Sequence, residues 1–180
     1  MDELALDAIR KNVTGILQNL PPEVLLVAAA KTRTAEEVNA AIQAGIQIVG
    51  YNYVQEAEHL RQTIDEPIKW HMIGHLQRNK VKKAVQLFDM IETIDSVRLA
   101  KEVNKQCAKL DKNMPVLIEI NSGKESNKTG VLPGNALALI QQINDLGNLQ
   151  ILGLMTMGPR FGNPEDARPY FKTTKALFEQ

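Results

Sequence analysis

The sequence is poor in the residues that mark secreted, disulfide-stabilised or membrane-spanning proteins. Cys107 is its single cysteine, which excludes a disulfide or a cluster of thiolate metal ligands within one chain. Aromatic residues make up only 4% of the 180 residues while hydrophobic residues make up 44%, so the core must be aliphatic. No apolar run approaches the roughly 20 residues of a membrane-spanning helix.

Net charge is also absent. The chain has 21 Lys and Arg residues against 21 Asp and Glu residues, which gives a formal net charge of zero. This balance gives no electrostatic reason to expect binding to nucleic acid or to an anionic membrane. The first residues, MDELALDAIRKN, carry acidic groups and no apolar stretch, unlike a signal peptide. We therefore expect a cytoplasmic protein.

Hydrophobic periodicity predicts alternating strands and helices in a chain long enough for one domain with a sizeable core. After a leading helix over residues 2–19, six strands are expected, over residues 24–30, 46–50, 68–73, 90–93, 115–120 and 149–155. Helices are expected between and after them, over residues 34–44, 54–63, 81–87, 97–109, 133–146 and 164–178. The first of these opens with Thr34-Ala-Glu-Glu37, which has the form of a capping box, and Gly45 stops it.

Repeated strand–helix units indicate a parallel sheet with helices outside it, either a doubly wound open sheet or a (β/α) barrel. The turn after the first strand, KTRTAEE, has no glycine fingerprint, which weakens the dinucleotide-binding form of the open sheet. Polar residues collect just after the strand ends: Lys31, Asn52, His75, Asn121 and Thr156. This distribution is typical of a barrel whose site lies on its C-terminal face. The sequence thus favours an α/β fold of the TIM-barrel type, preceded by an extra helix.

A complete barrel has eight strands and about 250 residues, whereas the sequence accounts for six strands. The final residues, TKALFEQ, lie within a predicted helix that has no C-terminal cap. We therefore expect residues 1–180 to form a single barrel domain that is truncated at its C-terminus. The two missing units would carry the loops that commonly bind phosphate. An open sheet also leaves unpaired strand edges, which predicts self-association.

Lys31 raises the question of why a core strand ends on a lysine, because this residue type is rarely buried without a partner. Low dielectric at the mouth of a barrel favours the neutral form of an amine, and a neutral amine is a nucleophile toward aldehydes. The alternative is a lysine whose stem packs on the core while its ammonium reaches solvent. From position alone, the solvent-reaching lysine is the favoured interpretation.

Five stretches carry a more specific pattern. They are VLLVAAAKT at 24–32, IVGYNYVQEA at 48–57, WHMIGHLQRNKVK at 70–82, VLIEINSGKESNKTG at 116–130 and GLMTMGP at 153–159. Together they resemble the pyridoxal phosphate homeostasis protein family over essentially the whole chain. The resemblance implies a single-domain, fold-type III barrel that binds pyridoxal 5′-phosphate (PLP). It also implies that Lys31 forms a Schiff base with this cofactor, which reverses the preference drawn from position alone.

The resemblance further implies residues around the cofactor. Asn52 would hydrogen-bond near the cofactor ring or cap the helix that follows, and both interpretations stay open. His75 would lie near the cofactor, more readily as a hydrogen-bonding group than as a general acid. His71 alternates with Trp70 along its strand, which predicts a satisfied core position. The family pattern Gly-Glu-Asn corresponds to Gly50-Tyr51-Asn52 in this chain. A phenol therefore replaces the carboxylate that the family has at the expected mouth of the barrel.

The remaining candidates lie later in the chain. Lys128 corresponds to a family lysine implied as a secondary site or handover point for PLP, while the alternative is a lysine in a solvated loop. Met155 would pack on the flat cofactor ring or serve as an ordinary interior residue, and Thr156 would frame the pocket. No third ligand accompanies the two histidines, so no metal site is expected. The family's later motifs, Met-Gly-Met-Ser-like and Val-Arg-Ile-Gly-like, do not occur in these 180 residues.

Three functions follow from these observations. The first is a non-enzymatic carrier that holds PLP on Lys31, serves vitamin B6 homeostasis and passes the cofactor to apoenzymes. The second is a racemase or decarboxylase on the same barrel, although Lys31-Thr-Arg-Thr34 differs from the Ala-Asn-Ala-Tyr-Gly-like run that follows the lysine of alanine racemases. The third is a truncated chain that binds no cofactor. The sequence favours the carrier.

Overall fold

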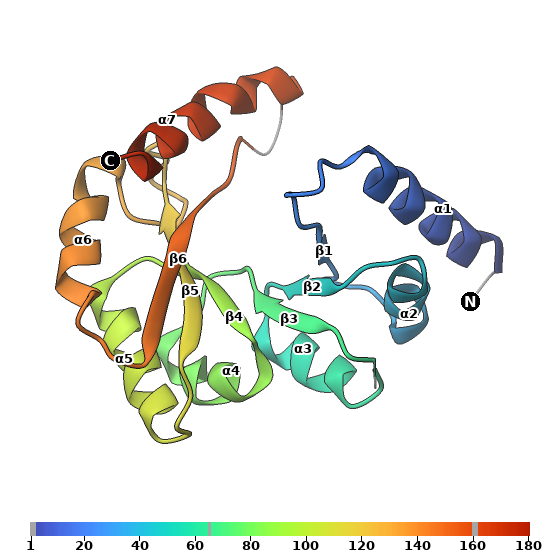
Figure 1. The fold of residues 1–180 in the computed structure, drawn as a ribbon, viewed down its shortest axis with the longest axis horizontal. Coiled ribbons are helices and arrows are strands. Elements are labelled where there is room, and N and C mark those ends of the chain that lie inside the picture. The colour runs from blue at the N-terminus through green and yellow to red at the C-terminus, as the bar shows by residue number, and fades with distance from the viewer. Residues whose placement is uncertain (1–2, 65, 160–161) are drawn as a thin grey trace.

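The computed structural model describes residues 3–64, 66–159 and 162–180 of the chain, in which six strands alternate with helices (Figure 1). The strands are β1 (Val27–Ala29), β2 (Ile48–Tyr51), β3 (Lys69–Met72), β4 (Met90–Ile94), β5 (Met114–Ile120) and β6 (Leu149–Thr156). The α-helices are α1 (Glu3–Asn19), α2 (Ala35–Gln43), α3 (Val54–Arg61), α4 (Val81–Leu87), α5 (Val97–Ala108), α6 (Ala136–Ile143) and α7 (Arg168–Phe178). Asp2, which was predicted to be helical, lies outside the described residues.

Three of these helices are preceded by 3-10 turns, namely η1 (Arg78–Lys80), η2 (Pro133–Asn135) and η3 (Pro164–Ala167). The capping box predicted for α2 is confirmed, because the Thr34 hydroxyl accepts from the Glu37 amide while the Glu37 carboxylate accepts from the Thr34 amide. Gly45 ends this helix with φ +112°, a conformation that favours glycine. No helix in the described part of the chain has both the length and the hydrophobicity needed to cross a bilayer.

All six strands belong to one parallel sheet in the order β1-β2-β3-β4-β5-β6. Each strand therefore lies beside its successor in sequence, which is the order of a (β/α) barrel, whereas a doubly wound sheet contains a switch in strand order. Figure 1 shows the sheet curved, with α3, α4, α5 and α6 around its outer side. The predicted TIM-type α/β architecture with an extra leading helix, α1, is thus confirmed.

The core fills the space between the outer face of the sheet and the helices. Strand β5 shows the alternation most clearly, because Val116 and Ile118 are fully buried while Leu117 and Glu119 between them are only partly covered. Val103 of α5 is also fully buried, and it belongs to the same cluster. The opposite face of β5 therefore points to the inside of the curved sheet, where Glu119 is available to a site.

Strand β1 differs from its prediction. Residues 24–30 were expected to form a strand buried on both faces, but β1 spans only Val27–Ala29, and Val24 and Leu25 before it are 45% and 72% exposed. Among the described strands β1 has β2 as its only hydrogen-bonded neighbour, and β6 likewise has only β5. The apolar run therefore has no second neighbour to bury it. Self-association through these two edges stays a prediction.

Tyr51 also lies in a different place from its prediction. The ring is fully buried on the outer face of the sheet, stacked on Trp70 with centroids 5.3 Å apart and an interplanar angle of 11°. Burial, and to a smaller extent the nearby Glu56 carboxylate, raises the pKa of the Tyr51 phenol to about 12. Tyr51 is therefore a core residue that supports β2 and β3, and the idea of a phenol at the barrel mouth is wrong.

Candidate functional site

The six strands end at one edge of the sheet, because they are parallel and ordered by sequence. Lys31, Asn52, His75, Asp95 and Asn121 follow β1 to β5 in turn, and Thr156 ends β6. The structure thus brings the predicted polar residues to a single face, the C-terminal face of the barrel. Because the strands are ordered by sequence, each of these polar residues lies next to the one that follows the neighbouring strand.

Lys31 stands in a tight turn just beyond β1. The Ala30 amide donates to the Gly50 carbonyl at 2.9 Å, which extends the pairing with β2, and the Arg33 amide closes the turn on the Ala30 carbonyl at 3.1 Å. Thr32, within this turn, has φ +62°. The side chain of Lys31 is exposed, and its ammonium has no hydrogen bond or ion pair with any described residue. The expected low-dielectric surroundings are therefore wrong, because no described strand covers the second flank of β1.

Asn52 is held against the end of β3 by a close backbone approach. A Cβ atom on Gly74 would lie only 2.5 Å from the Asn52 carbonyl oxygen, so only glycine fits at this position. The N-cap of α3 is Tyr53, with no side-chain hydrogen bond, so the helix-cap interpretation of Asn52 is wrong. Asn52 and His75 line the same hollow, together with Tyr53 and the first residues of α3.

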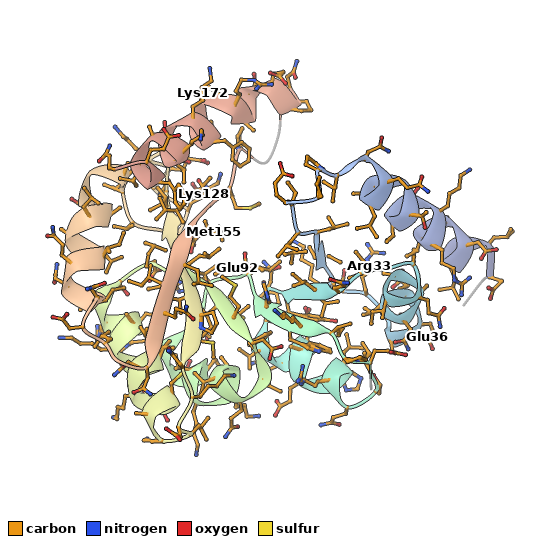
Figure 2. All side chains as sticks on the ribbon, viewed as in Figure 1. Arg33, Glu36, Glu92, Lys128, Met155 and Lys172 are labelled. Atoms are coloured by element: carbon orange, nitrogen blue, oxygen red, sulfur yellow. The ribbon has the colours of Figure 1, made fainter. Side chains whose placement is uncertain are left out.

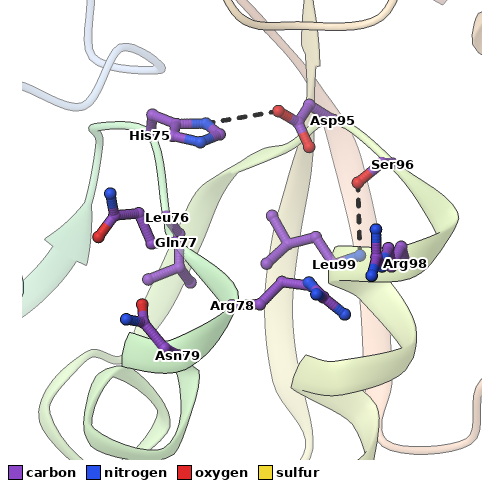
Figure 3. Close-up of a pocket in the computed structure, with 9 residues that line it drawn as sticks. All are labelled: His75, Leu76, Gln77, Arg78, Asn79, Asp95, Ser96, Arg98 and Leu99. Carbon is purple, nitrogen blue, oxygen red and sulfur yellow. Dashed lines mark hydrogen bonds and ion pairs between the residues drawn. The ribbon is translucent and has the colours of Figure 1, made fainter.

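Each of the two histidines has a carboxylate partner on β4 or directly after it. His75 is half-exposed, and its Nδ1 atom lies 3.5 Å from Oδ2 of Asp95 (Figure 3). His71 is buried, with Nδ1 2.7 Å from Oε1 of Glu92, which confirms it as a satisfied core residue. In the described residues no group of three or more His, Cys, Asp or Glu side chains is placed to hold a metal ion.

Lys128 and Thr156 connect the loops after β5 and β6. The Lys128 ammonium donates to the Glu125 carboxylate and, at 3.1 Å, to the Gly158 carbonyl. The Thr156 hydroxyl donates to the Ile120 carbonyl at 3.1 Å and lies 2.7 Å from the Ser122 hydroxyl. Both side chains already have protein partners, so their positions at the mouth are well fixed. These contacts support a loop-bracing role beside the cofactor roles predicted from the sequence.

Met155 faces the inside of the curved sheet, in register with Glu119 of β5. It lines a hollow together with Glu92 and with Phe171 and Phe178 of α7. Met155 and Glu92 are labelled in Figure 2. Glu119 is a residue that the sequence reasoning missed. Its Oε1 atom accepts from the Thr129 hydroxyl at 2.7 Å, whereas its Oε2 atom is buried without a hydrogen bond. The only signal in the sequence was a charged residue inside the apolar run VLIEI.

Replacing Glu119 with glutamine is expected to stabilise the fold at neutral pH. Burial raises the pKa of the Glu119 carboxyl, and Asp95 raises it further, while the Thr129 hydroxyl and His75 lower it. A pKa raised on folding means that ionisation of this carboxyl opposes folding as the pH rises through the folded-state value. The gain in the free energy of unfolding of the Glu119→Gln variant should therefore be present at pH 7.5. It should vanish below pH 4.5, the ordinary pKa of a glutamate carboxyl.

Urea denaturation at several pH values measures this difference in the free energy of unfolding. Glu23→Gln is the control, because Glu23 is an exposed glutamate that should show no such pH-dependent gain. Equal unfolding free energies for Glu119→Gln and the wild-type chain at pH 7.5 would show that the buried Oε2 atom is solvated in solution.

The same fold occurs in known proteins. Residues 4–180 match the family model described as alanine racemase, N-terminal domain. An alanine racemase of Clostridium difficile superposes with a TM-score of 0.79 at 16% identity, covering 97% of this chain and 47% of that one, and this likeness shows the fold alone. PipY of Synechococcus elongatus, solved with PLP bound, superposes with a TM-score of 0.86 at 29% identity, covering 95% of this chain and 80% of that one. The fold and the polar residues that follow its strands thus define a barrel of the alanine-racemase class.

Sequence comparison narrows this class. A pyridoxal phosphate homeostasis protein of Aquifex aeolicus is 38% identical over 156 residues, which cover 86% of this chain and 68% of the relative. The protein of the same name from Bos taurus is 35% identical over 196 residues, covering 98% of this chain and 70% of the relative. The chain belongs to the pyridoxal phosphate homeostasis protein family.

Proposed function

We propose that this chain is a PLP-binding protein of vitamin B6 homeostasis that holds the cofactor as a Schiff base on Lys31. The observation that carries the proposal is the position of Lys31, a primary amine without a protein partner at the C-terminal mouth of an alanine-racemase-type barrel. PipY, a structural neighbour, has been solved with PLP bound. In this proposal the chain acts as one cofactor-binding domain.

The residues at the mouth fit such a cofactor. When bound, PLP supplies an aldehyde carbon, which a neutral primary amine converts to a carbon–nitrogen double bond with loss of water. Lys31 is free to supply that amine, and Asn52 beside it offers an amide that no described group occupies. Toward the other side of the mouth, His75, Met155 and Thr156 would line the pocket, with Lys128 as a secondary contact.

A carrier is favoured over an enzyme because the relatives are named homeostasis proteins. The exposed position of Lys31 supports handover, since an amine from a second protein can reach the same carbon without passing through the barrel. The recipients in this proposal are PLP-dependent apoenzymes, and transfer to them would take place in the cytoplasm. Handover needs no catalytic base and no change in redox state, because the amine of the recipient displaces the Lys31 amine and one carbon–nitrogen double bond replaces another.

The visible absorbance spectrum of the 180-residue chain during titration with PLP tests this function. Borohydride reduction and peptide mass mapping then identify the attached residue. We expect a new band that saturates at one cofactor per chain, with the reduced label on Lys31. No band, or a label scattered over many surface lysines, would mean that this chain does not hold PLP.

A further inference from the structure

A second hollow adjoins the row of residues assigned to the cofactor, with which it shares His75, and lies between the loop after β3 and the start of α5. It is an open hollow of about 620 Å³. It is lined by residues 75–79 and by Asp95, Ser96, Arg98 and Leu99 at the start of α5 (Figure 3). This volume falls within the range of small-molecule sites, roughly 300–1,000 Å³. Leu76 and Leu99, each only 2% exposed, form the buried base of the hollow, and the other lining residues are polar or charged.

Two arginines without partners line this hollow. The guanidinium groups of Arg78 and Arg98 form no hydrogen bond or ion pair with any described residue. The other described arginines are all engaged: Arg10 with Glu3 and Asp7, Arg33 with Glu37, Arg168 with Glu165, and Arg61 over the Trp70 ring. The unpaired guanidinium groups of the described chain are therefore concentrated in a single hollow.

The electrostatics of the hollow favour an anion. Among the described residues, Asp95 is the one carboxylate that lines it, and its Oδ2 atom lies 3.5 Å from the imidazole Nδ1 of His75. Arg98 is the second residue of α5, and the first turn of this helix contains no acidic residue. A cation at a helix N-terminus is opposed by the helix dipole, so the arrangement leaves positive charge uncompensated. In Figure 3 the Arg78 side chain extends from η1 in the direction of α5.

We propose that this hollow is a second ligand site of the protein, which binds a small phosphate-bearing anion between Arg78 and Arg98. Guanidinium groups bind phosphate oxygens in a bidentate manner, and two of them match a dianionic phosphate. Leu76 and Leu99 are buried, so the polar and charged side chains of the lining determine what the hollow binds. The site does not involve Lys31, and His75 is the single residue that it shares with those assigned to the cofactor.

Phenyl phosphate and inorganic phosphate are the probes that test this site, with binding followed by calorimetry and by amide chemical shifts. We expect one site per chain, with shifts centred on residues 75–79 and the first turn of α5. The double variant Arg78→Gln/Arg98→Gln should weaken binding at least tenfold. Tighter binding of phenyl phosphate identifies an organic ester as the ligand, and equal binding of the two probes identifies free phosphate.

Lys82→Gln/Lys101→Gln is the matched control, because it removes two exposed positive charges from α4 and α5 without altering the lining of the hollow. This control and Lys31→Ala should bind both probes as the wild-type chain does, and far-UV circular dichroism checks that every variant is folded. An equal loss in the lysine control, shifts elsewhere in the chain, or no binding at millimolar probe would overturn the proposal. Stronger binding of a glutamate-rich peptide at the same residues would also overturn it, in favour of an acidic protein partner.

Discussion

The Lys31→Ala variant is expected to lose the visible absorbance band of the PLP complex entirely and to give no borohydride label at position 31. Lys31→Arg should behave in the same way, because a guanidinium keeps the positive charge but stays protonated and cannot act as the amine nucleophile. Lys31 is exposed and has no protein partner, so both substitutions should leave the free energy of unfolding within about 0.5 kcal/mol of the wild-type value. Difference spectra and mass mapping of the two variants, alongside the wild-type chain, measure the effect.

Lys128→Ala is the informative comparison for this experiment. The Lys128 ammonium is already held by the Glu125 carboxylate and the Gly158 carbonyl, so it is not expected to be the attachment point. This variant should keep both the band and the label on Lys31, with at most a weaker apparent affinity because the loops after β5 and β6 lose a brace. A band that survives in Lys31→Ala and disappears in Lys128→Ala would move the attachment site to Lys128.

Replacing Trp70 with alanine is expected to cost about 3–5 kcal/mol, a large share of the roughly 5–15 kcal/mol that stabilises a typical domain. Trp70 is 2% exposed, stacks on Tyr51 with ring centroids 5.3 Å apart, and carries the Arg61 guanidinium 5.1 Å from its ring centroid. Its removal leaves a cavity between the sheet and the helices and takes away the stacking partner of the Tyr51 ring on β2. Urea denaturation followed by far-UV circular dichroism measures the loss, because Trp70 is the single tryptophan and its fluorescence disappears with it.

Two milder variants separate packing from the loss of polar contacts. Trp70→Phe keeps a ring against Tyr51 and should cost distinctly less than Trp70→Ala. Tyr51→Phe removes a buried hydroxyl that has no hydrogen-bond partner, so its effect should be close to neutral or stabilising. A loss below about 1 kcal/mol in Trp70→Ala would mean that the surrounding core collapses into the vacated space, contrary to the stacked arrangement seen here.

The sequence predicted the architecture well because its signals are local. Each strand of a parallel sheet reads as a short apolar run, each helix has an amphipathic period, and caps such as Thr34 with Glu37 mark where a helix begins. All six strands and the helices between them were found at their expected places, with ends shifted by a few residues. The polar residues at the strand ends were likewise predicted correctly as a group, since parallel strands bring their C-terminal ends to one edge.

Side-chain surroundings were predicted less well, because they depend on neighbours that are distant in sequence. Tyr51 was expected at the mouth, yet all four residues of β2 are buried, so alternation along the strand could not reveal which face it occupies. Glu92 and Asp95 become the partners of His71 and His75 only through the pairing of β3 with β4. Glu119 lies in an apolar run of the sequence, and its burial depends in the same way on segments that are distant in sequence.

By itself, the sequence determined the order of strands and helices, the parallel barrel-type sheet and the row of polar residues after the strands. Local periodicity and capping are sufficient to specify these features. Only the tertiary structure decided that Lys31 is exposed, that Tyr51 belongs to the core, and that Arg78 and Arg98 line one hollow without protein partners. The physical reason is that exposure and pairing depend on which strands and helices lie alongside a residue, and contacts between distant segments set that arrangement.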